Sequence, residues 1–213
     1  MKIRKIEILA ILLVILSFGA AAYFFNIMPA KFASHWNIQG QADGYMSKFW
    51  GLFLMPFISL GMVVLFFVLP RIDPLKRNID DFRNYYDWFI ILILLFLLYI
   101  YKLTILWNLN YRFNMGQALV PAFAVLFFYS GILLEKSKMN WFIGIKTPWT
   151  LSSESVWGKT HKLGGLLFKI SAGLSLIGLI YARYAFYFVI VPIILSSIYV
   201  TYYSYAEYIK EKK

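Results

Sequence analysis

The stretch WFIILILLFLLYIYKLTILWN, residues 88–108, decides the fold class of this chain. It holds one charged side chain, Lys102, and is otherwise made of aliphatic and aromatic residues with a single threonine and a final asparagine. A helix needs about 20 such residues to cross the roughly 30 Å hydrocarbon core of a membrane. The stretch therefore predicts a transmembrane helix.

Further apolar runs of similar length lie on both sides of this one. The chain of 213 residues is 61% hydrophobic and only 15% charged, a composition that excludes an ordinary soluble domain. The first run follows MKIRK, as in a signal peptide, but it is longer than a signal-peptide core, so we expect it to be a retained helix. We predict an all-α, multi-pass helix bundle in the plasma membrane with about six spans, at residues 6–28, 49–69, 88–108, 117–134, 163–182 and 185–205.

Lysine and arginine are distributed unevenly between the predicted connections, which predicts the orientation. With the N-terminus inside, four of these residues lie outside, namely Lys31, Lys48, Arg112 and Arg183. Fifteen lie inside: Lys2, Arg4, Lys5, Arg71, Lys76, Arg77, Arg83, Lys136, Lys138, Lys146, Lys159, Lys162, Lys210, Lys212 and Lys213. We therefore expect both termini to be cytoplasmic. Inside loops that face anionic lipid account for most of the net charge of +11, so membrane lipids are expected partners and direct nucleic-acid binding is not.

The composition also limits the chemistry. The absence of cysteine excludes disulfides, thiol catalysis and cysteine metal sites. The two histidines, His35 and His161, fall on opposite sides of the predicted membrane, so we expect no metal site and no cofactor.

The predicted outer loop between the first two helices reads MPAKFASHWNIQGQADGYMSK, residues 28–48. Gly40 and the Asp43–Gly44 pair favour tight turns. The loop aromatics Trp36 and Tyr45 fit interfacial anchors. Alternatively, part of the loop forms an exposed platform that contacts something outside the cell; its residues are His35, Trp36, Asn37 and Asp43.

The predicted inner loop contains GIKTPWTLSSESVW, residues 144–157. Ser152 or Ser153 is a candidate helix N-cap with Glu154 in the first turn, a position that the helix dipole favours. One interpretation is an amphipathic segment that leads into the fifth helix, with Trp157 in the lipid headgroups and Lys159 and Lys162 on lipid phosphates. The other is a binding site that folds back on the cytoplasmic helix ends, with Pro148 fixing the turn, Trp149 and Trp157 in the interface, and four residues facing inward: Thr147, Thr150, Glu154 and His161.

The segment NWFIGIKTPWTLSSESVWGKTHKLGG, residues 140–165, resembles the signature of the SdpI family, and residues 28–48 resemble the N-terminal motif that often accompanies it. Two positions depart from the family pattern. Lys146 replaces the usual arginine and cannot form a bidentate fork, and Ala33 stands where a second proline is common. The resemblance divides the chain into a two-helix unit with the outer loop, residues 1–70, and a four-helix unit with the inner loop, residues 71–213.

The resemblance implies immunity against a secreted, membrane-active toxin peptide, and in the family's namesake also signalling through a cytoplasmic transcriptional repressor. Two other classes stay open. A transporter or exporter would be expected to carry acidic or arginine residues at mid-membrane, and the predicted spans have none. A membrane enzyme could use His161, Glu154 and a hydroxyl, but neither HExxH nor GxSxG is present, so we expect binding or masking and no catalytic residues.

Overall fold

A computed structural model describes residues 4–212. Lys2 and Lys213, which the charge pattern assigns to the cytoplasmic side, are not among the residues that the structure describes. Six helices are long and apolar enough to cross a membrane, which confirms the predicted bundle. The elements in chain order are α1 (Lys5–Phe24), β1 (Lys31–Trp36), β2 (Ala42–Ser47), α2 (Lys48–Ile72), α3 (Lys76–Asp81), α4 (Arg83–Asn108), α5 (Met115–Lys136), α6 (Glu154–Ser175), two 3-10 turns (Leu176–Leu179 and Ala182–Tyr184) and α7 (Ala185–Glu211).

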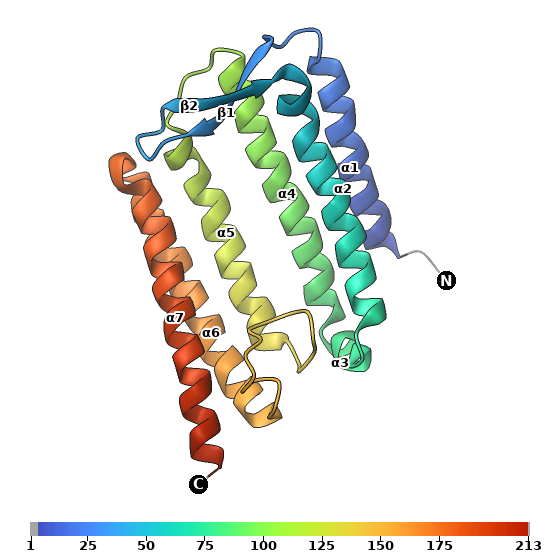
Figure 1. The fold of residues 1–213 in the computed structure, drawn as a ribbon, viewed down its shortest axis with the longest axis vertical. Helices are drawn as coiled ribbons and strands as arrows, with labels where there is room; N and C mark the ends of the chain where they lie inside the picture. Colours follow the sequence, from blue (N-terminus) through green and yellow to red (C-terminus); the bar gives the residue numbers. More distant parts are fainter. Residues whose placement is uncertain (1–3, 213) are drawn as a thin grey trace.

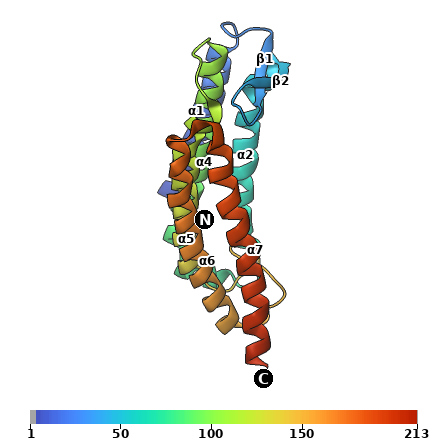
Figure 2. The same ribbon diagram turned by 90° about the vertical axis from the view of Figure 1, so that its left-hand side faces the viewer.

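The helices form a flat bundle whose connections gather at two ends (Figures 1 and 2). Helices α5, α6 and α7 pack side by side, and α4 joins α5 to the pair α1 and α2. One end carries the β1–β2 hairpin, and we call it the hairpin end. The other carries α3 and the segment 137–153 between α5 and α6, which we call the TPWT loop; we call this end the loop end (Figure 1).

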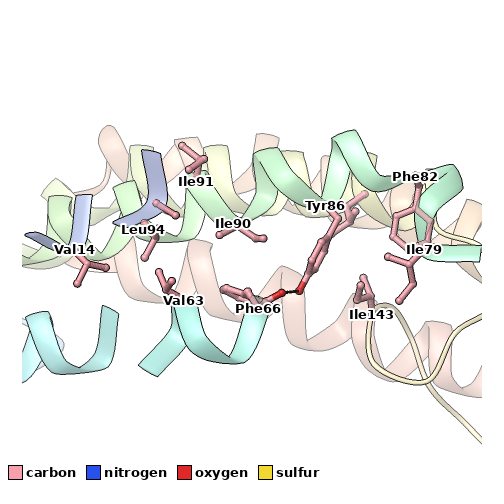
Figure 3. Packing of buried hydrophobic residues seen from close by; sticks show 12 residues of the cluster. Val14, Val63, Phe66, Ile79, Phe82, Tyr86, Ile90, Ile91, Leu94 and Ile143 are labelled. Carbon is pink, nitrogen blue, oxygen red and sulfur yellow. Dashed lines mark hydrogen bonds between the residues drawn. The ribbon is translucent and has the colours of Figure 1, made fainter. Parts of the chain in front are cut away.

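The buried core of the loop half lies where α1, α2 and α4 meet (Figure 3). Val14, Val63 and Leu94 contribute aliphatic side chains from these three helices. The Tyr86 hydroxyl donates to the Phe66 carbonyl at 3.0 Å, so a polar group in the core is satisfied by the helix it packs against. Ile143 belongs to the same cluster, so the TPWT loop is part of the core.

The fifth span begins earlier than the apolar pattern predicts. It starts at Glu154 instead of residue 163, because Ser153 caps the helix by accepting the Val156 N–H at 3.2 Å. The polar residues of the expected entry segment are therefore continuous with the membrane helix. Its N-cap could be predicted from the sequence, whereas its apolar periodicity starts only later.

The hairpin is the element that an all-helical prediction missed. Strands β1 and β2 pair antiparallel, with Lys31 opposite Ser47 and Trp36 opposite Ala42. The chain reverses at residues 37–41, where Gly40 has a φ of 78°. Asp43 and Gly44 lie within β2, so the expectation that they form a turn is wrong; Gly44 allows close strand approach, since a Cβ there would lie 2.7 Å from the Cβ of His35.

Candidate functional site

The Thr-Pro-Trp-Thr turn of the TPWT loop is closed by its own threonines. The Thr147 N–H donates to Thr150 Oγ1 at 2.9 Å, and the Thr150 N–H donates to Thr147 Oγ1 at 3.1 Å. Thr150 Oγ1 also donates to the Ile145 carbonyl at 2.9 Å, and its side chain is fully buried. Pro148 lies between the threonines with its ring exposed and φ fixed by covalent geometry. The turn therefore satisfies most of its buried polar groups by itself, and Thr147 Oγ1 also lies 3.1 Å from Ser204 Oγ of α7.

His161 and Trp157 form the wall against which this turn lies. Their rings stack with centroids 3.9 Å apart, and both side chains are buried. His161 Nε2 accepts the Ile145 N–H at 2.9 Å, so the proton of a neutral ring is on Nδ1, which lies 2.8 Å from the Trp157 carbonyl. Both ring nitrogens are thus engaged by backbone groups, and His161 holds the loop to α6.

Gly144 makes this close approach possible. Its φ of 121° favours glycine, and a side chain there would overlap the imidazole of His161 and come within 3.1 Å of the Trp157 ring. The glycine of the GIKTPWT motif is therefore explained by the histidine and tryptophan 17 and 13 positions later.

The two tryptophans of the motif have different surroundings. Trp149 is half-buried and packs on Tyr205 of α7 with centroids 5.1 Å apart. Trp157 is 2% exposed and donates its Nε1–H to the Ser137 carbonyl at 3.0 Å. The prediction that Trp157 sits in the membrane interface is wrong, because protein surrounds its ring.

Three charged residues of the motif lie outside this buried group. Glu154 is exposed, contrary to the inward-facing prediction, whereas Val156 and Trp157 of the same turn are buried. Lys146 is exposed and donates to the Phe142 carbonyl at 2.9 Å. Lys159, expected on lipid phosphate, pairs with Glu207 of α7 at 2.9 Å.

Two polar residues that the sequence reasoning missed hold the start of the loop. Asn140 is fully buried, and its Oδ1 accepts the N–H groups of Phe142 and Ile143 at 2.9 and 2.6 Å. Asp73, after α2, accepts the Leu75 N–H at 2.7 Å and the Trp141 N–H at 2.9 Å. The position of Asn140 at the head of the NWFIG segment was a usable signal. The pairing of Asp73 with a residue 68 positions away carried no local signal.

At the hairpin end, two of the four predicted residues are exposed on the surface, and the other two stabilise the hairpin. His35 Nδ1 lies 2.5 Å from Asp43 Oδ1, and both side chains are exposed. Asn37 shapes the reversal, since its Oδ1 accepts the N–H groups of Gln39 and Gln41 at 3.0 Å each. Trp36 is half-buried beneath the hairpin, so it does not serve as an exposed contact.

The hairpin is fixed to α4. Asn108 Oδ1 accepts the Ala33 N–H at 2.8 Å, and its Nδ2 donates to the Ala33 carbonyl at 3.0 Å. Beside this clamp, Trp36 meets Trp107 edge to face at 5.6 Å, and the Arg112 guanidinium lies 3.8 Å from the Trp107 ring centre. Asn108 was not predicted, although an asparagine at the end of an apolar run is a recognisable helix-end residue.

The structure therefore brings together Thr147, Thr150, Trp157 and His161 at the loop end, and His35 with Asp43 at the hairpin end. The two histidines are at opposite ends of the bundle, as expected (Figure 1). Within residues 4–212, no three side chains of His, Asp or Glu gather in a way that could hold a metal ion.

Comparison with known proteins matches both ends of the chain. Residues 12–60, which include the hairpin, match a domain of unknown function, DUF1648. Residues 136–204, which include the TPWT loop, match the SdpI/YfhL protein family. The immunity protein SdpI of Bacillus subtilis (strain 168) is 27% identical over 154 residues, which cover 72% of this chain and 71% of the relative. No solved structure matches. The predicted resemblance is thus confirmed: a segment at the hairpin matches DUF1648, and a segment from the TPWT loop into α7 matches the SdpI/YfhL family.

Proposed function

We propose that this protein protects the cell that makes it against a secreted, membrane-active peptide, and that it does so by binding or masking without chemical turnover. The similarity to an immunity protein supports this class of function. We further propose that the hairpin faces the outside and both termini face the cytoplasm, on the basis of the lysine and arginine asymmetry. A peptide that arrives from outside would then meet the hairpin end first.

One observation carries the proposal: Thr147, Thr150 and His161 of the SdpI segment are buried with their polar groups engaged, whereas the His35–Asp43 pair of the hairpin is exposed. At the loop end, the hydroxyls of Thr147 and Thr150 and both nitrogens of His161 already have protein partners. At the hairpin end, His35 and Asp43 are exposed as a pair. The TPWT loop thus supports the fold, and the hairpin offers the recognition surface.

The same geometry favours binding over catalysis. A general base needs a free lone pair within reach of its substrate. In His161 the lone pair of Nε2 already accepts the Ile145 N–H. Glu154, the other acid–base candidate, is exposed and forms no hydrogen bond or ion pair with His161. These contacts support a role for the motif in holding α5, α6 and α7 together.

The proposal is tested with a matched pair of charge-neutralising variants. Asp43→Asn removes the acidic member of the exposed pair on the hairpin. Asp81→Asn does the same at the loop end, where Asp81 pairs with Lys138 at 2.6 Å and both side chains are exposed. We expect cells that express the wild type or Asp81→Asn to keep their membrane potential when treated with a toxic secreted peptide, and cells with Asp43→Asn to lose it at several-fold lower peptide concentration. Equal protection by both variants at equal protein levels would exclude the His35–Asp43 pair from recognition.

Signalling through a cytoplasmic transcriptional repressor stays a prediction from the family resemblance. Such a partner would contact the loop end, where Lys146 and Glu154 are exposed. A test is whether deletion of the gene changes transcription of its neighbours in the presence of the peptide.

A further inference from the structure

A cavity of about 510 Å³ lies directly beneath the hairpin. The hairpin covers it, and α2, α4, α5 and α7 provide its sides, with Leu54, Tyr101, Leu119 and Phe186 among the lining residues. Most of its surface is apolar. Residues from both matched segments and from the helices between them therefore form one chamber.

Two residues that line this chamber, Tyr101 and Trp36, each carry a hydrogen-bond donor without a partner. The Tyr101 hydroxyl and Trp36 Nε1 are both buried atoms, and neither finds an acceptor within residues 4–212. Tyr101 is only 2% exposed as a whole residue. Buried polar groups in folded proteins nearly always have a partner, so two unpaired donors on residues that line one cavity indicate a ligand that supplies an acceptor.

The chamber is bordered by exposed apolar side chains. Trp50 is 52% exposed, Leu54 36% and Phe186 46%, and they come from α2 and α7. These two helices lie on the same side of the bundle (Figure 2). In a membrane-spanning bundle, exposed apolar residues near the helix ends face acyl chains, so this border joins the chamber to the bilayer.

Size decides between the two kinds of apolar occupant. A helix about 10 Å across advances 5.4 Å per turn, so a volume of this size would hold little more than one turn. A single extended acyl chain fits the size range of ligand pockets. The cationic residues Lys31, Lys48 and Arg112 lie at the same end of the bundle, where the phosphate of an anionic lipid would be placed.

We propose that this chamber binds one acyl chain of an anionic phospholipid, whose ester carbonyl accepts hydrogen bonds from Tyr101 and Trp36. This proposal does not rest on the protective function, although His35 of the exposed pair also lines the chamber.

The first test uses phosphatidylglycerol with a photoactivatable diazirine on one acyl chain, added to vesicles that contain the full-length protein. Mass spectrometry then maps the labelled peptides. We expect labelling around Leu54, Tyr101 and Leu119 to exceed labelling of the lipid-facing residues Leu195 and Ile198 of α7 several-fold. Uniform labelling of all exposed apolar residues would overturn the proposal.

A filling variant provides the matched control for this experiment. Gly116 lines the chamber, and an added Cβ there meets nothing closer than 3.4 Å. Gly173, on α6, is exposed and has nothing within 4 Å of an added Cβ. Gly116→Leu should reduce chamber labelling at least threefold, and Gly173→Leu should not change it. Preferential labelling of the chamber by a photoactivatable leucine-rich peptide would assign it to a peptide and overturn the lipid assignment.

Tyr101→Phe separates ligand binding from packing. The phenyl ring keeps the shape and removes the unpaired hydroxyl. We expect phosphatidylglycerol to raise the melting temperature of the detergent-solubilised wild type, and this rise to shrink in Tyr101→Phe while the lipid-free variant stays at least as stable as the wild type. An equal rise in both proteins would contradict a hydrogen bond from Tyr101 to the lipid.

Discussion

Substitution of Gly144 by alanine tests the role of the SdpI motif most sharply. The new methyl group would overlap the His161 imidazole, and the backbone φ of 121° would be strained with any side chain. A non-glycine residue at such a φ costs about 1–2 kcal/mol. Displacing His161 also breaks its bond with the Ile145 N–H, and leaving a buried donor unpaired costs roughly 1–3 kcal/mol. We therefore expect Gly144→Ala to lower the free energy of unfolding by about 2–5 kcal/mol.

Gly158→Ala is the matched control for this prediction. Gly158 lies in α6 one residue after Trp157, and nothing lies within 4 Å of an added Cβ. Glycine inside a helix is about 0.5–1 kcal/mol less favourable than alanine, so this variant should be slightly stabilised. Unfolding in mixed micelles, followed by near-ultraviolet circular dichroism of the tryptophans, measures both changes. If Gly144→Ala proved as stable as Gly158→Ala, the Gly144–His161 contact would not be a structural element of the motif.

Two further predictions concern the hairpin and the orientation. Asn108→Ala should free the hairpin from α4 and increase its cleavage by protease several-fold, because two hydrogen bonds worth about 0.5–1.5 kcal/mol each are lost, whereas the exposed Asn84→Ala on the same helix should leave cleavage unchanged. In this cysteine-free chain, Gln39→Cys should react with a membrane-impermeant maleimide added to intact cells, and Lys146→Cys should react only after the cells are opened; the reverse pattern would invert the proposed orientation.

The sequence was sufficient to predict the membrane bundle because long apolar runs such as residues 88–108 have one physical interpretation. It also indicated the fold-back of the TPWT loop, since a Thr-Pro-Trp-Thr turn followed by a serine N-cap constrains the backbone locally. Ser153 and the threonine pair behave as their residue types predict.

What the sequence could not provide were contacts between distant segments. The hairpin was missed because its strands are short and one of its anchors, Asn108, lies on α4, 75 positions from the Ala33 that it binds. The burial of Trp157 was missed because a tryptophan beside polar residues near a helix end fits a membrane interface equally well. Only packing against Ser137 and His161 distinguishes the two situations.

The most direct test of the central claim is to incubate the purified protein, in lipid nanodiscs, with a secreted peptide against which its expression protects cells. Size-exclusion chromatography followed by mass spectrometry then reports both association and the mass of the recovered peptide. We predict that the peptide elutes with the protein at unchanged mass, and that Asp43→Asn weakens this association while Asp81→Asn does not. Recovery of a cleaved or modified peptide would contradict protection by binding, and so would a protective protein to which the peptide does not bind.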